Sequence, residues 1–235
     1  MRKADAKVHT TLAFTSPRPF GWRMKPLTSA QTTMRLLANG RRELTIVHDL
    51  IRGVTPAMLH WWFCHIDDVM VYAGQTYPRY LVWHPTDHIY YRDLTRAADG
   101  SGHVGTTRQI VEAFQGNPRY LINIVDRVSH LGDDGILLTT EAAGIALPGI
   151  GNLLLPLPAG ISTLEHRFLP QPNGTRYESR LLLGAPGKVG ALALNPCLRH
   201  FVMNDSHARA WLQHNVEEVG NFEYFLPALW AQAAG

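Results

Sequence analysis

Two residues near the end of the chain, His214 and Glu218, have side chains and a spacing that suit a shared metal ion. In a helix, residues four apart lie on one face, one turn from each other. The imidazole and the carboxylate would then point the same way and could bind one cation. A surface ion pair is the alternative interpretation, so the site needs partners from elsewhere in the sequence.

A second source of ligands is the segment 80–88, which reads Tyr-Leu-Val-Trp-His-Pro-Thr-Asp-His. The segment predicts a strand followed by a proline-containing turn, which can direct an imidazole into a cavity. His84 and His88 are both candidates, and we favour His88. A surface histidine that bonds to the local backbone is the alternative for either residue.

The third element is Glu112, an acidic residue near the end of a β-prone, largely apolar segment, 106–114. A buried carboxylate must bind a metal, pair with a cation or take up a proton, because burying it alone is costly. Two imidazoles and two carboxylates suit Zn²⁺, and an expansion to five-coordination would leave a position for water or substrate. A site for Fe²⁺ built from the same residues is the less favoured alternative.

The elements that must position these residues begin and end with helices. Thr55 and Pro56 predict a helix start, because Thr caps free amides and Pro tolerates the first helical position. We expect this helix to run to about Asp67. A long final helix is expected from about Asp205 to Trp230, with one apolar face that can pack against a sheet.

The middle of the chain is expected to be an antiparallel meander. Its strand-like segments are rich in β-branched and aromatic residues: 80–83, 105–114, 120–128, 136–142, 162–168 and 176–183. Two of the turns between them carry strong turn sequences, Asp133-Asp134-Gly135 and Pro172-Asn173-Gly174. Helices followed by many strands and a last helix define an α+β fold with room for an internal cavity.

The bulk composition is that of an ordinary soluble globular protein of 235 residues, with 46% hydrophobic and 17% charged residues. We interpret residues 1–30 as an N-terminal arm on a single domain, 31–235. The net charge of +3 comes from scattered basic residues, which argues against nucleic-acid binding. Cys64 and Cys197 lie too far apart in sequence for a metal-binding pair, and no secretory signal is recognisable, so a cytoplasmic location is expected.

The longest apolar stretch, Ala142–Ile161, has about the length of a membrane span. Its prolines and glycines exclude a spanning helix, so no membrane partner is expected. We expect a loop packed over the core, with a flexible apolar wall or lid over a ligand pocket as the alternative.

At these residues the sequence resembles the 2,4-diacetylphloroglucinol hydrolase family, which includes phloretin hydrolase. These are zinc-dependent enzymes that cleave a carbon–carbon bond between an acyl group and a phenolic ring. The similar pieces lie in order within residues 55–230: Trp61-Trp62-Phe63 with His65, Arg79-Tyr80, Trp83-His84-Pro85, Asp87-His88, and His214 with Glu218 before Phe225-Leu226-Pro227.

The resemblance implies a Bet v 1-like, START-like helix-grip fold, in which a curved antiparallel sheet wraps around the C-terminal helix. It implies zinc ligands at four positions: His88, Glu112, His214 and Glu218. Tyr80 and, as a weaker candidate, Tyr177 would contact a phenolic ketone substrate. Trp62 is a further candidate for substrate binding in the cavity wall, with packing in the core as the favoured alternative. The resemblance also implies a homodimer.

The expected reaction is a hydrolysis of the retro-Claisen type, in which the metal polarises the acyl carbonyl and water attacks it. Glu112 and His84 are the candidates for proton transfer. Two other functions stay open, because a fold does not decide a function. One is a non-catalytic carrier of an aromatic or lipid-like ligand, and the other is a non-haem iron oxygenase that uses the same residues.

Overall fold

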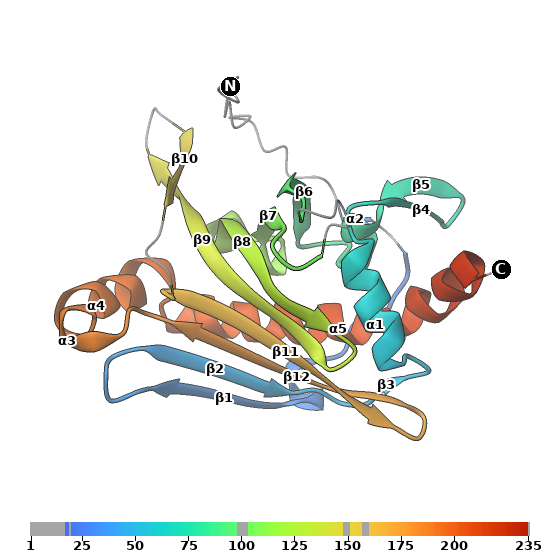
Figure 1. Ribbon diagram of the computed structural model, residues 1–235, viewed down its shortest axis with the longest axis horizontal. Coiled ribbons are helices and arrows are strands. Elements are labelled where there is room, and N and C mark those ends of the chain that lie inside the picture. Colours follow the sequence, from blue (N-terminus) through green and yellow to red (C-terminus); the bar gives the residue numbers. More distant parts are fainter. Residues whose placement is uncertain (1–16, 19, 98–102, 148–150, 157–159, 235) are drawn as a thin grey trace.

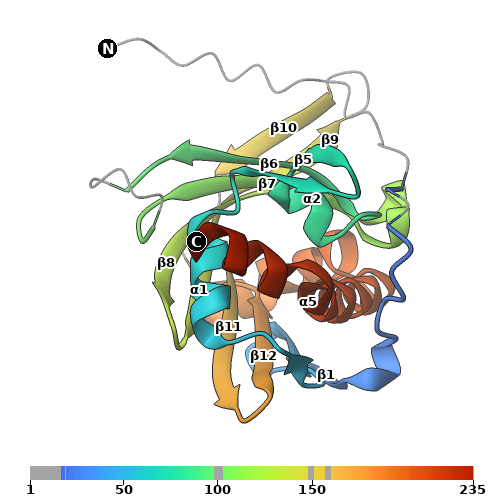
Figure 2. The same cartoon turned by 90° about the vertical axis from the view of Figure 1, so that its right-hand side faces the viewer.

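The computed structural model describes residues 17–18, 20–97, 103–147, 151–156 and 160–234. A long C-terminal helix, α5 (Asp205–Ala234), lies inside a strongly curved antiparallel sheet. Figure 2, turned by a quarter from Figure 1, shows the strands bending around this helix. The α+β helix-grip arrangement expected from the sequence is therefore confirmed.

The sheet and the smaller elements have the following bounds. The strands of the main sheet are β1 (Gln31–Leu36), β2 (Arg42–Val47), β3 (Ile51–Arg52), β6 (His88–Thr95), β7 (Thr107–Ala113), β8 (Leu121–Gly132), β9 (Gly135–Leu147), β10 (Gly151–Pro156), β11 (Ser162–Gln171) and β12 (Gly174–Leu183). They pair in the order β1-β2-β12-β11-β9-β8-β7-β6, with β10 on β9 and β3 on β12. A separate hairpin joins β4 (Val69–Tyr72) and β5 (Gln75–Pro78).

The remaining helices are short. They are α1 (Pro56–Cys64), α2 (Arg79–Trp83), α3 (Gly187–Val189) and α4 (Asn195–Cys197), with π-helical turns at Gly190–Leu194 and Leu198–Val202 and 3-10 turns at Leu27–Ser29, Phe114–Gly116 and Pro118–Tyr120. Helix α1 begins as expected, because the Thr55 side chain accepts a hydrogen bond from the Met58 amide at 3.3 Å. It ends at Cys64, three residues before the expected Asp67.

The two expected hairpin turns join neighbouring strands of the meander. Asp133 and Asp134 lie between Gly132 and Gly135, which pair across β8 and β9. Gly135 has a φ of +153°, and a Cβ built there would lie 2.1 Å from the carbonyl oxygen of His166. Glycine is therefore required where the hairpin meets β11.

The expectation of a strand at residues 80–83 is wrong, because these residues form α2. The segment has a strand-like composition, but tertiary contacts with α5 hold it as a helix. The Trp83 indole N–H donates to the Glu218 carbonyl at 2.8 Å, and the Asn221 amide donates to the Trp83 carbonyl at 3.0 Å. His84 consequently follows a helix, and His88 opens strand β6.

The expectation of a loop over the apolar stretch 142–161 is also wrong for its described part. Strand β9 continues to Leu147, and β10 folds back on it in antiparallel pairing. Residues 148–150 and 157–159 lie outside the described chain. Ala143, Gly144, Pro156 and Ile161 line an internal cavity, so the alternative of an apolar wall fits their position.

The described part of the N-terminal arm packs against the body. The Arg18 guanidinium donates to the carbonyl oxygens of Leu81, His84 and His88 at 2.9, 3.2 and 2.9 Å. The Trp22 ring stacks on Tyr224 of α5 with centroids 5.0 Å apart. The division into an arm and one domain at residue 30 stays a prediction. Among the described helices, none combines the length and the apolar character needed to cross a membrane.

Candidate functional site

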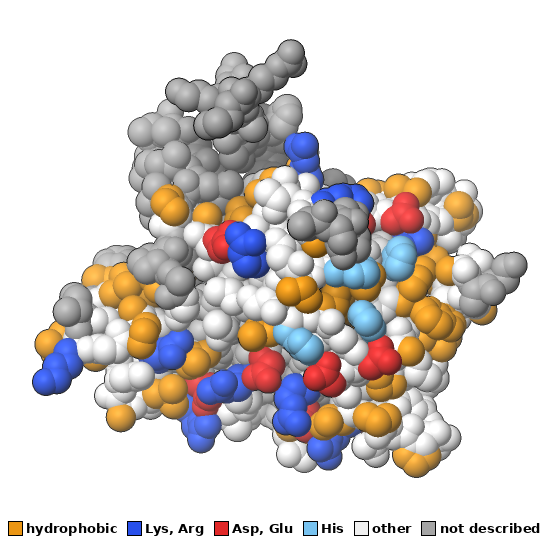
Figure 3. Space-filling view, in the orientation of Figure 1, with side chains coloured by type: hydrophobic (Ala, Val, Ile, Leu, Met, Phe, Trp, Pro, Cys, Tyr) orange, Lys and Arg blue, Asp and Glu red, His pale blue; other side chains and the backbone are white. Residues whose placement is uncertain are grey.

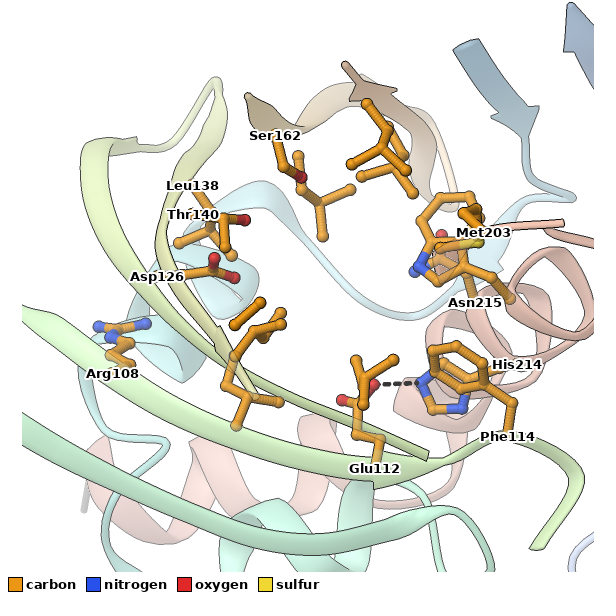
Figure 4. Close-up of a pocket in the computed structure, with 18 of the residues that line it drawn as sticks. Arg108, Glu112, Phe114, Asp126, Leu138, Thr140, Ser162, Met203, His214 and Asn215 are labelled. Atoms are coloured by element: carbon orange, nitrogen blue, oxygen red, sulfur yellow. Dashed lines mark ion pairs between the residues drawn. The ribbon is translucent and has the colours of Figure 1, made fainter. Parts of the chain in front are cut away.

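The four predicted ligands meet between the sheet and α5. Strand pairing places His88 of β6 directly opposite Glu112 of β7. One helical turn separates His214 from Glu218 on α5, and both face the same strands. All four are buried, with exposed fractions of 0% for His88, 8% for Glu112, 2% for His214 and 5% for Glu218. Figure 4 shows Glu112 and His214 facing each other.

The distances between the donor atoms fit a metal ion better than direct hydrogen bonds. His88 Nε2 lies 3.4 Å from Glu112 Oε1 and 3.5 Å from Glu218 Oε2. His214 Nε2 lies 3.5 Å from Glu112 Oε2 and 3.7 Å from Glu218 Oε2. Charge-assisted hydrogen bonds are shorter, about 2.7–2.9 Å. Bonds of about 2.0–2.1 Å to a tetrahedral zinc ion would separate neighbouring donors by about 3.4 Å.

Two further observations support the fit. His88 Nε2 is buried and has no hydrogen-bond partner, although an imidazole nitrogen in the interior normally has one. His88, His214 and Glu218 can each offer a ligand atom such that all three atoms lie within 4.8 Å of one another. Glu112 lies outside this trio and approaches the two imidazoles through different oxygens. The residues present therefore fit a zinc ion.

Both imidazoles are oriented by a partner on their other nitrogen. His88 Nδ1 donates to the Tyr80 carbonyl at 2.7 Å, and His214 Nδ1 donates to Asp87 Oδ2 at 2.9 Å. Asp87 also accepts hydrogen bonds from the amides of Gln115 and Gly116, each at 2.9 Å. These partners leave both Nε2 atoms pointing to the centre of the site, as in many metal sites. Sequence reasoning missed Asp87, and its position beside His88 was the available signal.

Each carboxylate is held by a neighbouring donor. The Tyr80 hydroxyl donates to Glu112 Oε1, and the Asn215 amide donates to Glu218 Oε1. The Tyr80 ring also stacks on the His88 ring, with centroids 3.9 Å apart and planes 4° apart. Tyr80 also lines the cavity described below.

The electrostatics of the site are dominated by burial and by crowded acids. Burial raises the pKa of Glu218 to about 8 and lowers the pKa of His88 well below its usual range. Burial also acts to lower the pKa of His214, but the carboxylates of Glu112, Glu218 and Asp87 outweigh it and raise the value to about 10. A divalent cation would offset the repulsion among these acids.

The site opens into a cavity of about 340 Å³ between the sheet and α5. Glu112, His214 and Glu218 form part of its wall. Most of the other lining residues are apolar, and the polar remainder includes Arg108, Asp126, Thr140, Ser162, His166 and Asn215. A mostly apolar cavity with a few convergent polar groups is typical of a small-molecule site.

On the face seen in Figure 3, basic and acidic side chains are interspersed.

The other predicted residues lie farther from this centre. His84 accepts a hydrogen bond from the Asp87 amide at 3.1 Å, and its ring centroid lies 4.7 Å from that of His214, on the Asp87 side. Trp62 packs in the aromatic core between α1 and α5, and Tyr177 is fully buried in the same core. None of these three is among the described residues that line the cavity. Proton transfer by His84 and substrate contacts of Trp62 and Tyr177 therefore stay predictions, without support from the described cavity wall.

Comparisons with known proteins agree with the sequence resemblance. A family model described as "DAPG hydrolase PhiG domain" matches residues 35–231. No curated protein matches the chain. The crystal structure of Ara h 8.0201 is 10% identical, with 85% of this chain and 99% of that chain covered and a TM-score of 0.45. Protein Ms6760 from Mycobacterium smegmatis is 11% identical, with 85% and 98% covered and a TM-score of 0.46.

Proposed function

The chain belongs to the DAPG hydrolase family, and on that premise we propose that it is a zinc-dependent carbon–carbon hydrolase. Its substrate would be a phenolic ketone in which an acyl group is attached to a phloroglucinol-like ring. The observation that carries this proposal is the meeting of two imidazoles and two carboxylates on one point in the wall of an apolar cavity.

The reaction consumes one water molecule. The hydroxyl of the water joins the acyl carbon, the ring carbon gains a proton, and a carboxylic acid and the deacylated phenol leave. A zinc ion held by His88, Glu112, His214 and Glu218 would supply a Lewis acid that polarises the acyl carbonyl. The apolar cavity wall would bind the apolar part of the substrate and exclude bulk water.

Glu112 is the best-placed group for moving the proton between the water and the ring. It lines the cavity, whereas His84 does not. The Tyr80 hydroxyl donates a hydrogen bond that holds the Glu112 carboxylate in place. The same hydroxyl group can orient a phenolic hydroxyl of the substrate beside Glu112. We therefore propose Glu112 for proton transfer and Tyr80 for positioning.

The test begins with the metal content of the purified protein and its reaction with monoacetylphloroglucinol. We expect about one zinc per chain, release of acetate, and no consumption of oxygen. His214→Ala should abolish both zinc binding and acetate release, because it removes one ligand and leaves the neighbouring acids without a counter-charge. His207→Gln, on the same helix, is the control and should keep both.

Three outcomes would contradict this function. Full zinc content and full activity in His214→Ala would exclude the site. Iron-dependent oxygen consumption would favour the oxygenase, which could use the same residues. A protein that binds the phenol tightly without metal or turnover would be a carrier.

A further inference from the structure

The cavity wall has a second polar region, at the end remote from the proposed metal ligands. Arg108, Ile110 and Glu112 are alternate residues of β7, and all three line the cavity. A strand rises about 3.3 Å per residue, so the α-carbons of Arg108 and Glu112 lie about 13 Å apart. Asp126 of β8 pairs with Arg108, and Thr140 of β9 pairs with Asp126. Figure 4 shows these three residues across the cavity from Glu112 and His214.

Asp126 is the unusual member of this polar row. It is only 2% exposed, and its Oδ1 atom has no hydrogen-bond partner. Burial raises the pKa of its carboxyl group to about 6, although a hydrogen bond from Thr140 acts in the opposite direction. A buried acceptor without a partner is destabilising, and most such groups in native proteins are satisfied by a ligand or by water. The carboxyl group points into the cavity (Figure 4).

The positive charge of Arg108 limits which ligand groups can bind next to Asp126. The Arg108 guanidinium donates to the Phe63 carbonyl at 2.8 Å, and its Nε lies 3.7 Å from Asp93 Oδ1. Its positive charge on the adjacent strand disfavours an ammonium group at this end of the cavity. The carboxyl group of Asp126 disfavours a ligand carboxylate. A neutral donor, such as a hydroxyl group, satisfies both constraints.

The wall between the two polar ends is apolar. Ile110 and Ile124 pair across β7 and β8, midway between the row of Glu112 and the row of Arg108. Leu138 and Leu164 also line the cavity. A molecule that spans the cavity would therefore place an apolar body between a carbonyl at the metal ligands and a donor at Asp126.

We propose that Asp126 determines substrate specificity by accepting a hydrogen bond from a hydroxyl group at the end of the acyl chain remote from the ketone. This inference rests on the proposed function, because that function places the ketone at His88, Glu112, His214 and Glu218. It goes further by naming the group at the opposite end and the residue that selects it.

The test uses two matched probes, octanoylphloroglucinol and 8-hydroxyoctanoylphloroglucinol, which differ only in the terminal hydroxyl. Their dissociation constants are measured by displacement of the fluorescent dye 8-anilinonaphthalene-1-sulfonate, and their kcat/KM by release of the carboxylic acid. The wild-type protein should bind the hydroxylated probe about tenfold more tightly, the size of one hydrogen bond to a buried carboxyl group. Equal binding, or tighter binding of the octanoyl probe, overturns the proposal.

Two variants sharpen the result. Asp126→Leu should reverse the preference without changing the zinc content, and Asp126→Asn, which keeps an acceptor oxygen, should retain part of it. Asp93→Asn is the control, because Asp93 contacts Arg108 and does not line the cavity in the described structure. An unchanged preference in a folded Asp126→Leu protein would also overturn the proposal.

The two readouts separate this inference from the proposed function. If neither probe is hydrolysed but the displacement assay keeps its hydroxyl preference, the hydrolase fails and the role of Asp126 stands. If both probes are hydrolysed with equal kcat/KM and bind equally, the hydrolase stands and the role of Asp126 fails.

Discussion

The fold buries two groups of histidines in very different surroundings. One group is the candidate metal site, where His88 and His214 face two carboxylates. The other is a serine-bridged pair, in which His48 Nε2 and His166 Nδ1 each lie 2.9 Å from the Ser179 hydroxyl oxygen. Both members of this pair are buried, and His166 also lines the cavity.

The two groups differ in the charge of one ring, His214, because burial also lowers the pKa of His88 well below its usual range. Burial lowers the pKa of His48 and of His166 to about 3, so both rings are neutral at physiological pH. His214 is equally buried, but its three neighbouring carboxylates raise its pKa to about 10. Burial by itself therefore leaves a histidine as a neutral hydrogen-bonding group. Acids at coordinating distance are what turn the other group into a candidate cation site.

The largest expected effect is the loss of zinc and activity when an imidazole of the candidate metal site is removed. Removing an imidazole of the serine-bridged pair provides the comparison. His88→Ala should lose zinc and reduce acylphenol hydrolysis more than about a hundredfold, since even residues that only orient metal ligands contribute about 10- to 100-fold. His166→Ala should retain zinc, because no metal ligand of the proposed set contacts it. Elemental analysis and acetate release measure both. If both variants lost zinc, the proposed difference between the candidate metal site and the serine-bridged pair would be wrong.

The next effect concerns the orientation of His214. Asp87→Asn removes the negative charge and leaves a single acceptor oxygen. It therefore weakens the hydrogen bond to His214 Nδ1 and keeps a hydrogen bond to only one of the amides of Gln115 and Gly116, which donate to different oxygens of Asp87. We expect about 10- to 100-fold weaker zinc binding, measured by competition with a chelator. The control is Glu217→Gln, which alters a neighbour of His84 and should leave zinc affinity unchanged. Equal affinities in wild type and Asp87→Asn would argue against an orienting role.

The third effect concerns the stability of the fold and not zinc binding. It is the pH dependence that arises from the serine-bridged pair. Between pH 6.5 and about 3, these imidazoles are protonated in the unfolded chain but neutral in the folded protein, because their folded pKa values are about 3. The free energy of unfolding should therefore fall as the pH falls from 6.5 toward 3, by at most about 1.4 kcal/mol per pH unit for each ring.

Urea unfolding at several pH values, compared between wild type and His166→Gln, isolates this contribution. The variant lacks one of the two rings, so its stability should fall less steeply with acid. The remaining groups are the same in both proteins, and their titration largely cancels in the difference. Identical slopes would show that His166 takes up protons as readily in the folded state as in the unfolded state.

Several parts of this molecule follow from local sequence. The hairpin turns at Asp133-Asp134-Gly135 and Pro172-Asn173-Gly174, the strands they join and the long helix α5 depend on turn residues and periodicity within short segments. The shared face of His214 and Glu218 follows from helix geometry alone. The sequence could therefore predict an α+β fold and the helical half of the site.

The tertiary structure decided the rest, because it depends on which distant segments touch. Packing against α5 made residues 79–83 a helix, and this change carried His88 to the start of β6 opposite Glu112. In the folded protein His84 lies beside Asp87, and Trp62 and Tyr177 lie in the core. The role of Asp87 depends on its contact with His214, a residue distant in sequence, and its place beside His88 is the only local signal for it. The unpartnered carboxyl oxygen of Asp126 is likewise set by strand register and burial.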